Sequence, residues 1–84
     1  MTRFWPDGVA ITVMCDALAT PTAFAWQHQR HGIAQIVERW RVDEGWWKKR
    51  AWREYFQVIT RTGLLIEIYH DVRTGQWYLQ RVYD

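Results

Sequence analysis

The chain has 84 residues, a formal net charge of +2 at pH 7, a single cysteine and an aromatic content of 17% that includes seven tryptophans. This length predicts one domain over residues 1–84, too small to bury every aromatic ring in one core. The lone Cys15 excludes an intrachain disulfide and a thiolate metal cage, and no apolar run approaches a membrane-spanning length. We therefore expect a cytoplasmic domain without a secretion signal, some of whose aromatic side chains are half-exposed or covered by a partner.

Turn residues divide the N-terminal half into short segments rich in Val, Ile, Thr and aromatic residues. The sequence WPDG at 5–8 predicts a turn, because Pro fixes φ and Gly tolerates the exit conformation. Residues 9–15 (VAITVMC) predict one strand. Residues 23–27 (AFAWQ) predict another, because Phe24 and Trp26 alternate with small residues.

The segment 32–42 (GIAQIVERWRV) fits two structures. Its apolar residues fall at helical spacing, yet no Ser, Thr, Asp or Asn cap precedes them. We expect a strand here, with a short helix over 33–41 as the alternative. The preceding QHQRHG (27–32) fits either a hairpin loop or a helix entry.

The C-terminal part predicts three consecutive strands, over 52–60, 64–72 and 76–84, joined by two Arg-Thr-Gly turns. A three-residue loop with a left-handed Gly pairs Thr60 with Leu64 and places one aliphatic face on the inside. The same loop at 73–75 sets Glu67 beside Arg81. The second face then collects Tyr55, Leu65, Tyr69, Leu79 and Tyr83.

Because both faces of this meander are apolar, something must cover the second one, either the N-terminal strands or another chain. The elements together predict a mainly β fold. We expect a small antiparallel sheet or partly open barrel of five or six strands that ends in the three-stranded meander.

The residues predict no reaction. His28 and His31 lie three positions apart, but one such pair with a distant His70 is a weak metal signal. Glu54 and Asp71 should lie near the same end of the sheet, where ion pairing with arginines is simpler than a paired-acid site. We expect no catalytic site, no metal and no cofactor.

The segment 39–53 combines basic and aromatic residues at unusual density. It holds six basic residues against two acidic ones, and four tryptophans. Trp40, Trp52 and the following Phe56 are expected to belong with the sheet. The candidate binding residues are Arg41, Trp46, Trp47, Lys48, Lys49, Arg50 and Arg53. Such a set suits single-stranded nucleic acid, which uses basic grooves and stacking rings, and equally suits a protein hot spot.

Several motifs in order resemble a known family: Trp40-Arg41, the Trp46-Trp47 pair, Arg53 with Tyr55, the strand from Gly63 to Asp71, and residues 75–84 (GQWYLQRVYD). The chain is similar to a small domain of unknown function that occurs as a short standalone bacterial protein. A similar domain closes the C-terminal end of the mutasome subunit related to inactive Y-family DNA polymerases.

The resemblance carries no catalytic residue and implies an accessory module linked to DNA repair or translesion synthesis. We therefore expect a non-enzymatic module that docks a protein partner through its aromatic and basic surface. Direct binding of single-stranded nucleic acid by the same residues is the alternative, and a homodimer is a further one.

Overall fold

The computed structural model describes the backbone of residues 2–46 and 49–83, and the side chains of residues 2–43 and 52–83. The described residues form six strands and no helix, so the strand expected over 33–41 is confirmed and its helical alternative is wrong. No described helix is long and apolar enough to span a membrane. The strands are β1 (Arg3–Cys15), β2 (Pro21–Trp26), β3 (Gln29–Trp46), β4 (Lys49–Thr60), β5 (Leu65–Asp71) and β6 (Trp77–Tyr83).

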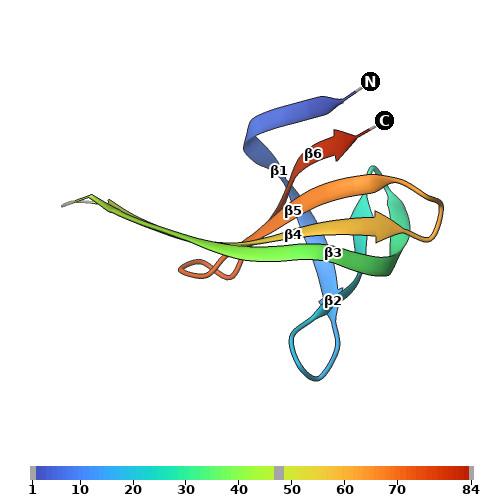
Figure 1. Ribbon diagram of the computed structural model, residues 1–84, viewed down its shortest axis with the longest axis horizontal. Coiled ribbons are helices and arrows are strands. Elements are labelled where there is room, and N and C mark those ends of the chain that lie inside the picture. The colour runs from blue at the N-terminus through green and yellow to red at the C-terminus, as the bar shows by residue number, and fades with distance from the viewer. Residues whose placement is uncertain (1, 47–48, 84) are drawn as a thin grey trace.

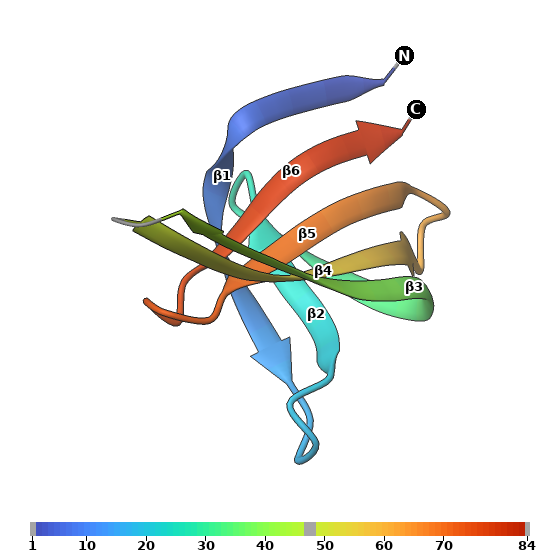
Figure 2. The same ribbon diagram turned by 60° about the vertical axis from the view of Figure 1, so that its left-hand side comes forward.

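Each strand pairs antiparallel with the next along the chain, and β6 returns to pair with β1, which closes the sheet into a ring (Figures 1 and 2). The pairing around the ring is uneven, because β1 and β3 each pair with their two neighbouring strands along different parts of their length. Residues 29–32 of β3 pair with β2, whereas residues 33–46 pair with β4. This unevenness makes the fold a closed antiparallel meander and not a regular barrel.

The core lies inside the ring and is mainly aliphatic, with Phe24 and Trp26 from β2 and Phe56 from β4. Full burial of each such side chain stabilises the fold by about 1.5–3 kcal/mol. The fully buried hydrophobic side chains are Phe24, Phe56, Val58, Ile66, Ile68, Leu79 and Val82.

The register predicted for the β4–β5 hairpin is confirmed. Thr60 N donates to Leu64 O at 2.9 Å, and Val58 and Phe56 stand opposite Ile66 and Ile68. The turn glycines Gly63 and Gly75 have φ of 93° and 78°, the left-handed conformation that an Arg-Thr-Gly loop requires.

The register predicted for β5–β6 is correct only near the C-terminus. Glu67 stands opposite Arg81, but the register then shifts, and Ile68 stands opposite Leu79. The extra residue is Gln80, whose Nε2 donates to Pro6 O at 3.3 Å. This bulge turns Leu79 into the core and not onto the second face, where it was expected.

The sequence WPDG, expected to form a turn, instead lies within β1. The β1–β6 register shifts between Phe4 and Val9, so this segment bulges from the strand. Gly8 has φ of 74°, and a Cβ at that position would lie 2.8 Å from the Cβ of Tyr78. Tyr69 Oη donates to Asp7 O at 3.3 Å. The bulge therefore covers part of the second face. The N-terminal strands were one of the two covers expected from the sequence.

Candidate functional site: the projecting arm and its aromatic face

The β3–β4 hairpin extends well beyond the ring. β5 pairs with β4 only as far as Arg53, which stands opposite Asp71, and one further backbone bond joins Val72 N to Trp52 O at 3.0 Å. β3 and β4 continue to pair with each other until Trp46 stands opposite Lys49. We call residues 41–53 the arm; Figure 1 shows it projecting to the left of the ring.

Most of the predicted binding residues belong to the far end of the arm. Trp47 and Lys48 lie outside the described residues, and so do the side chains of Trp46, Lys49 and Arg50. In the described backbone of this segment, Gly45 stands opposite Arg50. The prediction that these five side chains form a binding patch therefore stays a prediction, whereas Arg41 and Arg53 are described in full.

Arg41 is tied to a carboxylate at the base of the arm. Its Nη2 lies 3.0 Å from Glu54 Oε2, and Arg39 Nη2 lies 3.2 Å from Glu54 Oε1. Burial alone raises the pKa of Glu54, but the hydrogen bonds and charges of the two arginines outweigh it and hold that pKa below its ordinary value. The partners of Glu54 come from β3, and not from the neighbourhood of Asp71 as the sequence suggested.

Asp71 instead organises its own turn. Its Oδ1 accepts hydrogen bonds from Arg73 N at 3.0 Å and from Thr74 N at 3.3 Å. A carboxylate that accepts successive backbone N–H groups fixes a turn in the manner of an Asx motif. Asp71 is therefore a structural residue of the β5–β6 connection.

Arg53 lies over the outer face of the sheet. Its Nη1 donates to Tyr55 Oη at 3.3 Å, and its guanidinium carbon lies 4.7 Å from the centroid of the Tyr69 ring. The hydrogen bond to Tyr55 is the main cause that raises the pKa of Arg53 above its ordinary value. Arg53 thus connects the arm to the aromatic residues of β4 and β5.

Four aromatic rings form a continuous row across the outer face, one from each of β3, β4, β5 and β6. Trp40 and Tyr55 stack with centroids 5.2 Å apart and planes 4° apart. Tyr55 and Tyr69 follow at 5.2 Å, and Tyr69 and Tyr78 at 5.0 Å. We call these four side chains the aromatic row. Tyr69 is buried at its centre with 3% exposure, and the other three are half-buried.

The row differs from the second face that the sequence predicted. Tyr55 and Tyr69 belong to the row. Tyr83 lies on the same face of the meander, opposite Leu65, as predicted, but is not a member of the row; its hydroxyl accepts a hydrogen bond from Arg81 Nη1 at 3.1 Å. Trp40 and Tyr78 complete the row. Their places depend on the β3–β4 register and on the bulge at Gln80, which local periodicity does not reveal.

The geometry of the row determines what it can bind. Each stacked ring covers a face of its neighbour, so the flat surfaces that would accept a nucleobase are occupied between adjacent members. Trp40, Tyr55 and Tyr78 remain half-buried on this outer face. Half-exposed aromatic side chains of this kind are typical of protein interfaces.

Cys15, Arg39, Arg41, Glu54, His70 and Trp77 are among the residues that line a pocket of about 320 Å³ at the opening of the ring. His70 stacks on Trp77 with centroids 4.5 Å apart, and His31 stacks on Phe24 at 5.1 Å. Two of the three histidines thus pack against aromatic rings. Among the side chains that the structure describes, no three His, Cys, Asp or Glu gather as they would around a metal ion.

A family model described as a domain of unknown function, DUF6504, matches residues 1–84. The chain belongs to this DUF6504 family. Searches of curated proteins and of solved structures found no match. Membership agrees with the expected small domain, and the family description states no activity.

Proposed function

We propose that this DUF6504 domain is a non-enzymatic interaction module that docks a protein partner through the arm. The single observation that carries the proposal is the projection of the arm beyond the ring. Residues 43–46 pair with residues 49–52, and the core is built from other residues. Ordering so many residues outside a core costs conformational entropy that burial does not offset. A function in binding accounts for such a hairpin.

The chemistry of the arm supports a protein as the partner. The arm carries three tryptophans and five basic residues, and Trp and Arg are among the side chains that dominate protein hot spots. Its base is held rigid, because Glu54 binds Arg39 and Arg41 and because Arg53 lies over Tyr69. A rigid base lowers the entropic cost of presenting the far end of the arm to a partner.

Single-stranded nucleic acid is the alternative occupant. Among the described residues the ring faces of the aromatic row are covered by one another, and two of the arginines are partly neutralised by Glu54. Both features weigh against stacking of bases on this face. The basic residues at the far end of the arm could still contribute to nucleic-acid binding, which is therefore the other outcome of the test.

The class of partner rests on sequence resemblance alone. Because the motifs resemble the C-terminal domain of a mutasome subunit, we propose a bacterial cytoplasmic role in which the partner is a protein of DNA repair or translesion synthesis. The charge of the arm suits an acidic surface on that protein.

The test uses the full chain, immobilised, against a panel of purified bacterial replication and translesion-synthesis proteins, and against a single-stranded oligonucleotide. We expect one protein of the panel to bind, and Trp47→Ala or Arg50→Ala to weaken binding while the domain stays folded. Leu18→Ala and Arg30→Ala are matched controls, because Leu18 is 84% exposed and Arg30 is exposed away from the arm.

Salt dependence separates the two occupants. If three or four phosphates are neutralised, the logarithm of oligonucleotide affinity falls with the logarithm of salt with a slope of roughly −2 to −3. Tight oligonucleotide binding with that slope, and no protein bound, would replace our proposal by the alternative. Equal loss of binding in the control variants would show that the arm is not the binding site.

A further inference from the structure

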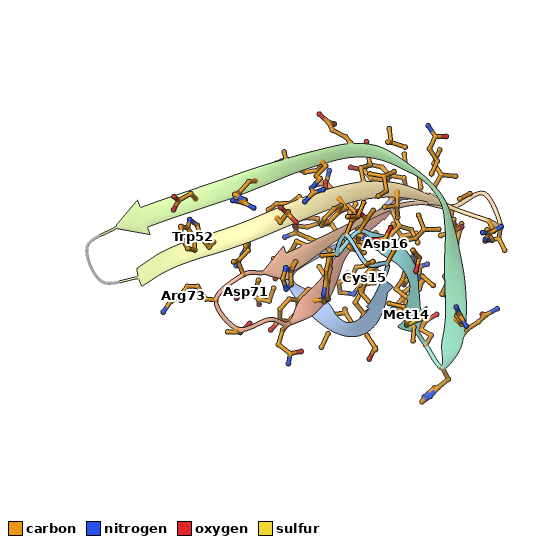
Figure 3. The ribbon with its side chains drawn as sticks, turned by 90° about the horizontal axis from the view of Figure 1, so that it is seen from below. Met14, Cys15, Asp16, Trp52, Asp71 and Arg73 are labelled. Carbon is orange, nitrogen blue, oxygen red and sulfur yellow. The ribbon has the colours of Figure 1, made fainter. Side chains whose placement is uncertain are left out.

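Along the arm, one edge of β3 has no neighbouring strand among the residues that the structure describes. β3 pairs with β2 only at residues 29–32, and from Glu38 onward it pairs with β4 alone among the described strands. Figure 3 shows β3 as the outer margin of the hairpin, with no other ribbon beyond it. The edge runs without a register shift from Glu38 to Trp46, since both bulges of β3 lie before Glu38.

The register shows which residues direct their backbone groups to this edge. Thr60 N bonds to Leu64 O, and the β4–β5 register then continues without a shift to Arg53. Even-numbered residues of β4 therefore bond to β5, and odd-numbered residues bond to β3. The β3 residues opposite those odd-numbered positions include Trp40 and Val42.

It follows that the backbone N–H and C=O groups directed outward are those of the alternate residues Arg39, Arg41, Asp43 and Gly45. Natural proteins protect such edges with bulges, prolines, covering segments or charged side chains, above all lysine. This edge has no proline and no lysine between Glu38 and Trp46, and it carries charges of both signs. It is therefore suited to pair with another strand.

We propose that this edge binds the same edge of a second copy of the chain, antiparallel, with Val42 of one copy opposite Val42 of the other. In that register Arg41 of each copy stands opposite Asp43 of the other, and all four residues direct their backbone groups into the new ladder. Two cross-strand ion pairs then form around the symmetry axis.

Charge selects this register over its neighbours. In an antiparallel ladder between two identical edges, one residue lies on the symmetry axis. The alternative registers that keep the same hydrogen-bonding pattern place a neighbouring residue, such as Arg41 or Asp43, on that axis. A ladder centred on Arg41 places arginine opposite arginine, and one centred on Asp43 places aspartate opposite aspartate. The centre at Val42 avoids both repulsions and gains two attractions.

The same register extends the ionic arrangement already present in the chain. Arg41 is held by Glu54 at 3.0 Å on one side, and Asp43 of the second copy approaches on the other side. The row of charges across the joined sheet therefore alternates negative, positive, negative. The guanidinium has donors for both carboxylates.

This inference goes beyond the proposed function, because it joins the β3 edge, with Arg41 and Asp43, to a second copy of the chain, whereas the proposed function docks a different protein on the arm. A chain that stays monomeric yet binds its partner would overturn only the dimer. A dimer that binds nothing in the panel would overturn only the docking role.

The first test exchanges the two charges, with molecular mass measured by sedimentation over a range of concentrations. The full chain is expected to dimerise, and Arg41→Asp and Asp43→Arg each to raise the dimer dissociation constant by about tenfold or more, since both ion pairs become repulsive. An equimolar mixture of the two variants restores the opposite charges and is expected to form a heterodimer. Arg30→Asp, away from the edge, should leave the dimer unchanged.

The second test reports the register directly and needs no change of charge. In a non-hydrogen-bonded antiparallel pair the Cα atoms lie about 4.5 Å apart, within reach of a disulfide. In a Cys15→Ser background, Val42→Cys is therefore expected to cross-link two copies under mild oxidation. Val37→Cys, on the same strand and 46% exposed, is the matched control and should not.

Either of two results overturns the inference. One is a full chain that remains monomeric at every concentration, and the other is a dimer that survives both charge reversals. Far-UV circular dichroism of each variant verifies its fold, and the Val42→Cys cross-link decides the question if a charge variant does not fold.

Discussion

Trp40 on β3 lies parallel to Tyr55 on β4, with their ring centroids 5.2 Å apart and their planes 4° apart. The pair stands where the arm leaves the ring, and Tyr55 also accepts a hydrogen bond from Arg53. The Tyr55 side chain therefore contacts Trp40 on β3 and Arg53 on its own strand. The pair lies next to the arm and belongs to the aromatic row.

Truncation of Tyr55 should therefore cost more than loss of its hydroxyl. Tyr55→Ala removes two ring contacts of the aromatic row and is expected to lower the free energy of unfolding by about 2–3 kcal/mol. Tyr55→Phe keeps the rings and loses only the bond from Arg53, about 0.5–1 kcal/mol. Urea unfolding of both variants measures the difference. Equal effects would show that the stacking contributes nothing to stability.

Gly8 should be much less tolerant of substitution than Gly63. Both have positive φ, 74° and 93°, but a Cβ at Gly8 would meet Tyr78 Cβ at 2.8 Å, whereas none lies within 4 Å of a Cβ at Gly63. Gly63→Ala is expected to cost about 1 kcal/mol for the backbone alone. Gly8→Ala adds the clash and should cost at least twice as much in thermal or urea unfolding. Similar losses would mean that the β1 bulge does not pack on the sheet.

The β2–β3 turn offers a stabilising substitution. Trp26 stands opposite Gln29, and the two turn residues between them, Gln27 and His28, have φ of 53° and 60°. Such a turn strongly prefers Asn-Gly, and each left-handed residue without that preference costs about 1–2 kcal/mol. The double variant Gln27→Asn, His28→Gly should raise the midpoint of thermal unfolding. A lowered midpoint would indicate that the replaced side chains make compensating contacts.

Two glutamates should give opposite pH dependences of stability. The folded-state pKa of Glu54 lies below its ordinary value of 4.5, so its contribution is present above that value and lost as pH falls through the folded pKa. Burial raises the pKa of Glu67, against the opposing charge of Arg81, so its contribution is present below pH 4.5 and lost as pH rises through the folded pKa.

The measurement is the urea midpoint of the full chain, Glu54→Gln and Glu67→Gln between pH 3 and pH 7. Relative to the full chain, Glu54→Gln should lose stability mainly at the upper end of this range. Glu67→Gln should lose the part of the profile that declines as pH rises. Parallel profiles for all three chains would contradict both assignments.

The meander could be predicted from the sequence because its signals are local. The strands 52–60 and 64–72 alternate in character, and the Arg-Thr-Gly loop fixes their register, so the residue pattern alone pairs Val58 with Ile66, as the β4–β5 ladder does. The ambiguous segment at 33–41 also resolved to the expected strand, since it pairs with β4 along its length.

The remaining features depend on contacts between residues far apart in the chain. The bulge that turns Leu79 inward places Gln80 against Pro6, and the bulge of β1 places Asp7 against Tyr69. Neither partner can be inferred from a local pattern. The length of the arm likewise depends on where β5 ends, and the binding of Glu54 by Arg39 and Arg41 follows from that geometry.

The central claim is that the arm serves binding and is dispensable for the fold. Its most direct test is the affinity of a shortened chain, in which an Asn-Gly turn replaces residues 43–52 and joins Val42 to Arg53, which already stand opposite each other. We predict that this chain keeps the circular dichroism spectrum of the full chain and binds the protein retained by the full chain at least about tenfold more weakly. A folded, shortened chain of undiminished affinity would contradict the account.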